Sequence, residues 1–529
     1  MLVAKKISFF VALLVIIPMI FLLFSFTEVQ TENWLHLIHF QLPTMLKSTA
    51  VLLVGVLLGT SLIALPLAYF QTFYQFPGRS LFEVLFLLPL AFPLYVYAAI
   101  GLTLFGLTGD ITLWISKHTG LSPFLINIKN QFGLIQIFSF ALYPYLYVTM
   151  REAFETHGGK VFEVATSLKI KKSVAIRKIL LPITKPWYAA GIILIAMETL
   201  ADFGASSMFN ATTFTTGIYR SWFGLFSLAT AEQVASMLMI IIFICVFFYK
   251  KFESKKNYSM AVKSISPKKK KLKGVKLVLL YLGYAIFLVA VVGVPFYFLF
   301  QKTILVLGGS RGDDFILSLQ APLYHSLYLS LIATIIILGL SYTMAYARRF
   351  QLKNSFDIFW FETSKLGYAI PGTILAVALY VPLNKIDQII FGKSVLTFSL
   401  IPLFLGYTVR FVSIGLNPLE VSFKKLSSSH SSQIIVYGLS SLTQWKKIYF
   451  PLTVTTALSA FFLVFLELLK ELPITLMTRP FGRDTLAVKI FEYTSEGDWD
   501  RAAVPSFILV SLGIVAVIMV YLRFNKKYS

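Results

Sequence analysis

Two segments of the 529-residue sequence, residues 163–202 and 432–471, align on each other without a gap at an offset of 269 positions. At this offset Pro182 falls on Pro451. Each copy runs from a basic segment through the proline into an apolar stretch that holds two acids four residues apart. These acids are Glu198 and Asp202 in the first copy and Glu467 and Glu471 in the second. The duplication predicts a chain of two similar halves with a polar centre.

Apolar residues make up 57% of the sequence and charged residues only 13%, which is too little charge to cover a soluble protein of this length. The apolar residues form runs of about 20, the length of one membrane-spanning helix. The predicted spans are 7–26, 47–70, 80–106, 132–150, 187–208, 233–249, 277–300, 326–346, 356–381, 395–413, 452–477 and 503–522. We therefore predict an all-α, polytopic membrane protein with about 12 transmembrane helices.

The net charge of +23 comes from Lys and Arg in loops between these spans, so we expect contact with the lipid bilayer and no nucleic acid. Basic loops all fall on one side of the predicted spans. By the positive-inside rule this side is the cytoplasm, and both the N- and the C-terminus lie there. The run 7–26 is predicted to be the first membrane helix, since no small-residue cleavage pattern follows it. Cys245 is the single cysteine and permits no disulfide.

Two halves with the same topology follow from this orientation. Residues 1–249 form the first transmembrane half, and residues 275–529 form the second. Both halves begin and end on the cytoplasmic side, so they are predicted to repeat in parallel about an axis along the membrane normal. Residues 250–274 form a basic cytoplasmic linker, which we expect beside anionic lipid head groups.

The basic loop 163–182 combines apolar and basic residues at helical spacing. Such a segment suits docking into a groove on a partner protein, and it equally suits a helix lying on lipid. The residues alone leave both open. The sequence contains no G-x-x-x-x-G-K-[ST] motif, so energy for any transport must come from a partner or an ion gradient.

Both loops resemble the EAA loop of ABC importer permeases, in which a Glu-Ala-Ala motif precedes a glycine and then Ile-x-Leu-Pro. The first copy matches at Glu163, Ala165, Ile179 and Pro182, with Lys169 in the glycine position. The second copy matches at Gly438, Ile448 and Pro451, with Ser432 in place of the glutamate. The resemblance implies that these residues couple the chain to an ATPase, and the different departures imply unequal coupling by the two loops.

A closer resemblance is to the ferric-iron importer permeases, which fuse two six-helix halves in one chain. It is carried by the strings METLADFG at 197–204, TFTTGIYR at 213–220 and KELP at 470–473. It implies a type I ABC importer permease of a bacterial cytoplasmic (inner) membrane. The implied partners are two copies of an ABC ATPase subunit, which bind ATP and Mg, and a periplasmic or extracellular substrate-binding protein. The chain itself is expected to hold no cofactor and no catalytic residue.

The intramembrane acids are the candidate translocation path. A charge at the bilayer centre costs about 2.5–3.5 kcal/mol, so it persists where it lines a cavity, is paired or has a function. The predicted path residues are Glu198, Asp202, Glu467, Lys470 and Glu471, with Lys470 placed to pair with Glu467. Gly204 and Pro473 are predicted to break the two helices just beyond the acids.

Four carboxylates favour a cationic cargo, and hard cations prefer oxygen ligands. We therefore expect ferric iron to pass Glu198, Asp202, Glu467 and Glu471 transiently, with no permanent metal site. Thiamine or another small cation is an alternative cargo for the same machine. A proton-coupled secondary transporter that uses the same acids is an alternative of another class. Tyr219 and Arg220 are predicted near the outer mouth.

Overall fold

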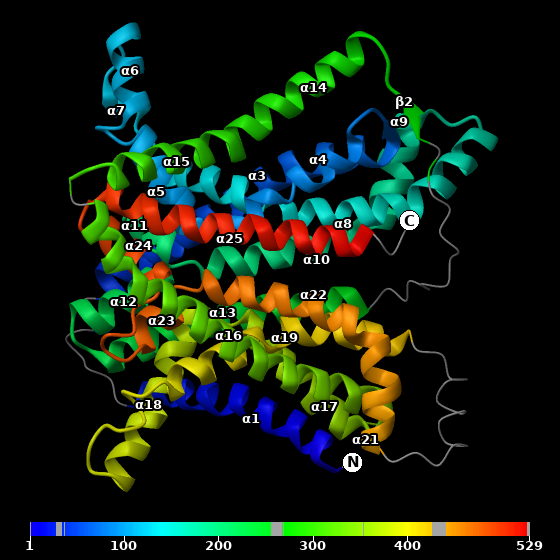
Figure 1. The fold of residues 1–529 in the computed structure, drawn as a ribbon. Helices are drawn as coiled ribbons and strands as arrows, with labels where there is room; N and C mark the ends of the chain where they lie inside the picture. Colours follow the sequence, from blue (N-terminus) through cyan, green and yellow to red (C-terminus); the bar gives the residue numbers. More distant parts are fainter. Residues whose placement is uncertain are drawn as a thin grey trace.

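The chain folds into a bundle of long helices, as the composition predicts (Figure 1). The computed structural model describes residues 2–27, 34–35, 37–254, 267, 269–310, 312–352, 354–425 and 441–525. Within these ranges the strands are two short ones, β1 (Tyr74–Gln75) and β2 (Lys270–Lys271), which pair in parallel. The predicted fold class, an all-α polytopic membrane protein, is confirmed.

Each predicted span corresponds to a helix or a pair of helices. In the first half these are α1 (Leu2–Leu23), α3 (Leu42–Phe73), α4 (Arg79–Leu85) with α5 (Leu94–Phe105), α8 (Gln131–Ser167), α10 (Leu181–Ala201) and α13 (Leu228–Ser254). In the second half they are α14 (Val275–Leu288) with α15 (Val294–Leu307), α16 (Gly312–Phe350), α17 (Ser355–Ser364) with α18 (Gly372–Ile390), α19 (Ile401–Lys424), α22 (Phe450–Leu469) and α25 (Trp499–Asn525).

Shorter helices connect the long ones, and of these α11 and α23 matter for the site below. They are α6 (Asp110–Thr119), α7 (Pro123–Ile126), α9 (Lys172–Ala175), α11 (Gly204–Met208), α12 (Phe214–Tyr219), α21 (Ser441–Gln444), α23 (Pro473–Thr478) and α24 (Leu486–Ser495).

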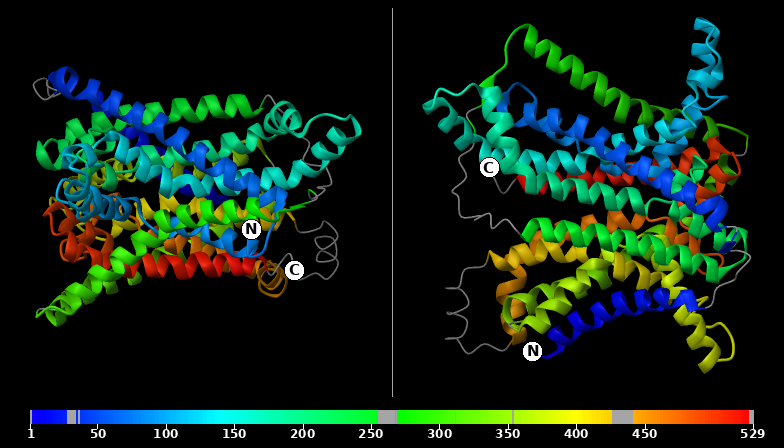
Figure 2. Two further views of the ribbon diagram at one scale, coloured as in Figure 1. Left: turned by 90° about the horizontal axis from the view of Figure 1, so that it is seen from above. Right: turned by 180° about the vertical axis from the view of Figure 1, so that it is seen from behind.

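Ten helical segments of the described residues are long and apolar enough to cross a membrane. The two further predicted spans are α13, whose described apolar part is Leu228–Ile244, and α19, which carries the charged residues Arg410 and Glu420. Both run alongside the other long helices (Figures 1 and 2).

Two predicted spans, 80–106 and 356–381, are wrong as continuous helices. Each is broken in its middle by a 3₁₀ turn, Leu88–Ala91 in the first half and Lys365–Ala369 in the second. The next helix then starts after Pro93 or Pro371, which both have an extended backbone at the N-cap position. A proline disfavours helical geometry in the residue before it, so the apolar run continues while the helix does not.

The first helix of each half packs against the other half. Helix α1 lies against α16, α17 and α18, and Lys5 forms an ion pair with Asp357 at 2.8 Å. In turn α14 lies against the first half, where the rings of Tyr284 and Phe86 are 4.9 Å apart. Because α1 packs on the second half and α14 on the first, the two halves exchange their first helices (Figure 1). The division of the sequence at 1–249, 250–274 and 275–529 stays a prediction.

Candidate functional site

Both acid-bearing helices end close to the predicted breaks, but between the two acids of each pair and not beyond them. Helix α10 ends at Ala201 and α11 starts at Gly204, while α22 ends at Leu469 and α23 starts at Pro473. The second acid of each pair therefore lies outside the helix that carries the first. Asp202 has an extended backbone, with φ −69° and ψ 133°. The four-residue spacing of the acids would place them on one face of a continuous helix, but the chain leaves the helix between them, so they do not share a face.

Asp202 and Glu471 instead cap the short helices that follow. Asp202 accepts hydrogen bonds from the backbone N–H and the hydroxyl of Ser206, both at 2.9 Å. Glu471 accepts from the backbone N–H groups of Ile474 and Thr475 at 2.9 and 3.0 Å and from the Thr475 hydroxyl at 2.8 Å. The first N–H groups of a helix have no partner within it, and a carboxylate satisfies them and favours the positive end of the helix dipole.

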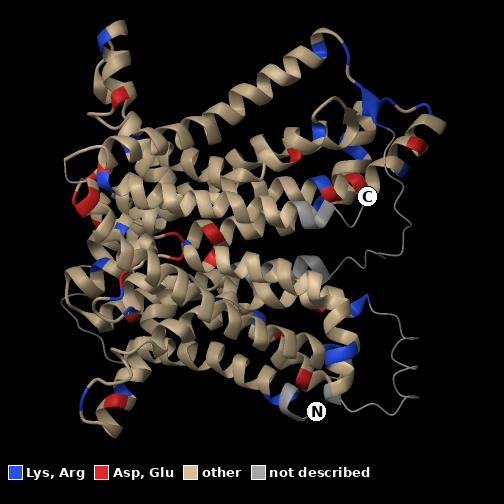
Figure 3. Ribbon diagram, viewed as in Figure 1, with Lys and Arg blue, Asp and Glu red and all other residues tan. Residues whose placement is uncertain are grey.

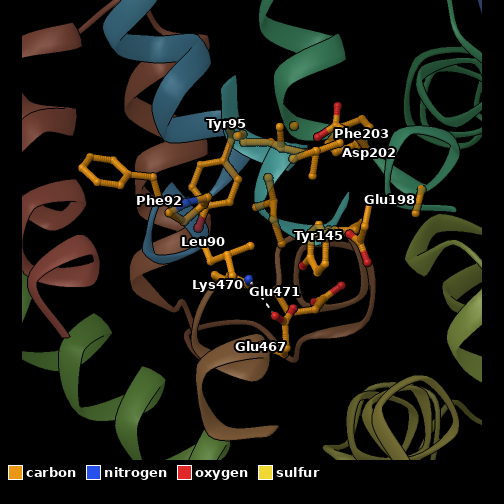
Figure 4. A pocket seen from close by; sticks show the side chains of 18 of the residues that line it. Leu90, Phe92, Tyr95, Tyr145, Glu198, Asp202, Phe203, Glu467, Lys470 and Glu471 are labelled. Carbon is orange, nitrogen blue, oxygen red and sulfur yellow. Dashed lines mark ion pairs between the residues drawn. The ribbon is translucent and has the colours of Figure 1, made fainter. Parts of the chain in front are cut away.

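All five predicted path residues line one cavity of about 110 Å³. Its walls come from the turn before α5 and from α5, α8, α10, α19 and α22. The polar residues in its lining are Tyr145, Glu198, Asp202, Arg410, Glu467, Lys470 and Glu471. Figure 4 shows these acids around the same space. In Figure 3 most charged residues lie toward the two ends of the bundle, and this group is set between them.

The two halves contribute different charges to this cavity. The Lys470 ammonium lies 2.7 Å from a Glu467 carboxylate oxygen, which confirms the predicted pair. Glu198 accepts a hydrogen bond from the Tyr368 hydroxyl of the second half at 2.5 Å. Among the described residues no Lys or Arg lies within ion-pair distance of Glu198.

Arg410 is a cavity residue that the sequence reasoning missed. It is buried, with 8% of its surface exposed, and one guanidinium nitrogen donates to the Ile370 carbonyl oxygen at 3.3 Å. Its Nε has no hydrogen-bond partner. The signal was present, because an arginine inside the predicted span 395–413 is as costly in lipid as an acid.

No metal-binding group forms in the part of the chain that the structure describes, since no three His, Cys, Asp or Glu side chains there come together in a suitable arrangement. Of the predicted outer-mouth residues, Tyr219 is half-buried, with its ring 4.7 Å from that of Phe203. Arg220 is exposed. Tyr219 therefore packs against its neighbours and Arg220 lies at the surface, while their place at an outer mouth stays a prediction.

The two basic loops share an irregular geometry. Five residues before α10, Ile176–Leu180, form a π-helical turn, and so do the five before α22, Trp445–Tyr449, at the same offset of 269. Lys178 and Lys447 occupy matching places and are both exposed. The sequence repeat is thus a structural repeat down to a local distortion.

The predicted coupling residues differ in exposure. In the first loop Glu163 and Lys169 are exposed, Ala165 is buried, and Ile179 and Pro182 are half-buried. In the second, Ile448 is half-buried and Pro451 exposed, whereas Gly438 and Ser432 lie outside the described residues. Lys169 has φ +54°, the left-handed region that glycine favours. This backbone conformation accounts for the glycine that the EAA loop pattern has where this chain has Lys169.

Comparison with known proteins gives relatives of one kind. No family model matches the chain. It is 24% identical over 517 residues to the Fe(3+)-transport system permease protein FbpB 2 of Haemophilus influenzae, covering 97% of this chain and 96% of that protein. It is 23% identical over 483 residues to a probable ABC transporter permease protein, y4fN, of Sinorhizobium fredii, covering 85% and 80%.

A shorter match is to the sulfate transport system permease protein CysT of Escherichia coli, 26% identical over 198 residues, which covers 37% of this chain and 69% of that protein. The matches to the Haemophilus influenzae and Sinorhizobium fredii proteins, by contrast, extend over most of the chain. The chain is a polytopic, all-α membrane protein that resembles, over most of its length, permease proteins of ABC transporters.

Proposed function

We propose that the chain is the transmembrane permease subunit of an ATP-driven importer that carries ferric iron into the cytoplasm by alternating access. The observation that carries the proposal is the match to a ferric-iron permease over 97% of this chain and 96% of the relative. A match of that extent spans both halves of the chain, so the similarity is not limited to one shared loop.

The charge of the cavity supports a cationic cargo. Four acids line it against two cations, Arg410 and Lys470, and Lys470 is neutralised by Glu467. Glu198 keeps a carboxylate without a cation beside it. Oxygen ligands suit a hard cation such as ferric iron. In this proposal these acids pass the ion on without retaining it, as transport requires.

The loops support an external motor. Two copies of an ATPase subunit would bind at the basic loops around Ile176–Leu180 and Trp445–Tyr449. ATP and Mg would be held by those subunits, and a binding protein would deliver the cargo at the opposite face, near Arg220. Because α1 and α14 each cross to the other half, movement of one loop would shift helices of both halves around the cavity. Transport then follows from the different affinities of the two states.

Uptake of radioactive ferric iron tests the cargo. In cells that lack the chain and are complemented with variants, Glu198→Gln should lower uptake about tenfold at equal membrane abundance, because it removes the carboxylate that has no cation nearby. Glu496→Gln, which changes an exposed acid outside the cavity, is the matched control and should retain uptake. Uptake of thiamine should be the same with and without the chain. Ferric uptake that does not depend on the chain would contradict the proposal.

The motor is tested separately. Glu163→Arg, on the exposed face of the first loop, should reduce co-purification of an ATPase subunit with the chain. ATP depletion should stop uptake, while a protonophore applied with ATP maintained should not. If the protonophore stopped uptake and ATP depletion did not, the results would favour the proton-coupled transporter.

An oxyanion importer is a second candidate, favoured by one observation. The buried Arg410 lines the cavity, and its guanidinium, which donates to the Ile370 carbonyl oxygen, has further N–H groups that suit a planar or tetrahedral oxyanion. Part of the chain also matches a sulfate permease and a probable molybdenum permease. Under this candidate Arg410→Gln abolishes sulfate or molybdate uptake and leaves ferric uptake unchanged.

A further inference from the structure

A second cavity lies away from the acids, in a groove between α3 and α14. Its volume is about 840 Å³. The groove is defined here by Leu62, Ile63, Pro66, Leu67, Phe70 and Tyr74 on the α3 side and by Leu279, Leu280, Gly283, Tyr284 and Phe287 on the α14 side. Both helices belong to candidate membrane spans, so this groove opens along the part of the protein that lipid surrounds.

One end of the groove is strongly basic. Lys270, Lys271, Lys273 and Lys276 line it, and all four are exposed. None of them forms an ion pair with a carboxylate of the described residues. The strand pair β1–β2 fixes this end, because Tyr74 and Gln75 at the end of α3 pair with Lys270 and Lys271. Figure 3 shows the cluster beside the start of α14.

Away from this end the walls of the groove are almost wholly apolar. Tyr284 is 4% exposed, and its hydroxyl is buried within the protein, out of reach of the groove. Apolar walls and a basic mouth match the two parts of a phospholipid, its acyl chains and its phosphate.

We propose that this groove binds an anionic phospholipid, with an acyl chain between α3 and α14 and the phosphate at Lys270, Lys271, Lys273 and Lys276. The charges select an anionic over a zwitterionic head group, since basic pockets beside membrane helices attract anionic lipid. The bound lipid would also fill the space that separates α14 from α3 and so hold the linker between the halves in place. The site is independent of the cargo and of the motor.

Lipid retention measured by native mass spectrometry of the full-length chain in detergent tests the proposal. The probes are phosphatidylglycerol and phosphatidylcholine with identical acyl chains. We expect phosphatidylglycerol to be retained at least about tenfold better, given an attraction of about 1 kcal/mol, or about fivefold, for each lysine near an anionic head group. Equal retention of the two lipids would overturn the proposal.

Neutralising the four groove lysines to Gln should abolish this preference. The matched control neutralises Lys169, Lys171, Lys172 and Lys178, which are exposed in the first basic loop and do not line the groove. The control should keep the preference. If both quadruple variants lose it equally, the attraction is a general effect of charge and there is no site at the groove.

Gly283→Trp tests the groove without touching a charge. A Cβ at Gly283 would meet nothing within 4 Å, so a large side chain has room and fills the groove. We expect phosphatidylglycerol retention to fall at least about tenfold while size-exclusion elution stays that of the parent protein. Retention that survives Gly283→Trp, or that is displaced by inorganic phosphate at equal concentration, would mean that the lysines bind phosphate without an acyl chain, and would overturn the lipid assignment.

Discussion

The two helix breaks at the cavity are copies of one another in backbone and differ in charge. At both breaks an acid caps the helix that follows, Asp202 for α11 and Glu471 for α23. The acid one turn earlier has a different partner in each half. Glu467 is paired with Lys470, whereas Glu198 accepts a hydrogen bond from Tyr368 of the other half. Duplication has kept what the fold needs at both sites, and divergence has changed the charge that a cargo would meet.

The first test of this comparison is the removal of each cap. Glu471→Ala removes the acceptor of two backbone N–H groups and a hydroxyl at a site that is 6% exposed. Replacing a side chain that caps a helix N-terminus by Ala costs about 0.5–2 kcal/mol, and burial favours the upper end, so we expect a loss of about 2 kcal/mol. Asp202→Ala should cost less, since Asp202 is half-buried and accepts two hydrogen bonds of 2.9 Å, against three of 2.8, 2.9 and 3.0 Å at the buried Glu471.

Thermal unfolding in detergent, followed by tryptophan fluorescence, measures both variants. Glu496→Ala, at an exposed position, controls for the loss of one acid and should leave the midpoint unchanged. If Asp202→Ala lowered the midpoint as much as Glu471→Ala, burial would not be what distinguishes the two caps.

The second test concerns the ion pair between Glu467 and Lys470 of the second half, which has no counterpart at Glu198 in the first half. Glu467→Gln leaves the Lys470 ammonium uncompensated in the cavity. Under the ferric-iron proposal we expect uptake to fall about tenfold, equivalent to about 1.4 kcal/mol, because an unpaired cation repels the cargo. Adding Lys470→Met should restore most of the uptake. A double variant as inactive as the single one would show that the Glu467 carboxylate itself is needed.

The third test exploits the backbone of the first basic loop. Lys169 has φ +54°, and a residue with a Cβ in this region is less stable by about 1 kcal/mol than glycine. Lys169→Gly should therefore raise the unfolding midpoint, and Lys169→Val should lower it because a β-branched residue fits this region worst. Differential scanning fluorimetry of the three proteins gives the order directly. A glycine variant less stable than the parent would mean that the Lys169 side chain makes a stabilising contact.

The smallest effect concerns the outer ends of the halves. In the second half Arg479 and Lys489 lie 2.7 and 3.1 Å from Asp484. Burial alone would raise the pKa of Asp484, but the hydrogen bonds from these two residues outweigh it and hold the pKa below its usual value of 3.8. The lowered pKa of Asp484 stabilises the folded protein. This stabilisation is complete above the pKa that Asp484 has in the unfolded chain, and it is lost as the pH falls through the pKa that Asp484 has in the folded protein.

We therefore expect the segment 479–492 to lose protection from hydrogen exchange by a few fold between pH 5 and pH 3, a change of under about 1 kcal/mol. The corresponding segment of the first half, 209–219, is held by the uncharged caps of Thr213 and Thr216 and should respond less. Asp484→Asn should remove the difference. Equal loss in both segments would show that acid acts on the bundle as a whole.

Much of the fold follows from the sequence read locally. The apolar runs predict the positions of the long helices, since each must bury its backbone groups in lipid by itself. Gly204 and Pro473 predict the two breaks, and the spacing of Glu467 and Lys470 predicts their ion pair. The capping role of Asp202 had a local signal as well, because an acid just ahead of a helix start can accept from its first N–H groups.

What the sequence alone determined is the set of helices, their breaks and the twofold repeat, because each depends on residues within a few turns of one another. The tertiary structure decided which charges meet. It brought Tyr368 to Glu198 and Arg410 into the cavity, and it placed the first helix of each half against the other. These contacts join residues more than a hundred positions apart, and their pairing depends on how whole helices pack, which no local pattern specifies.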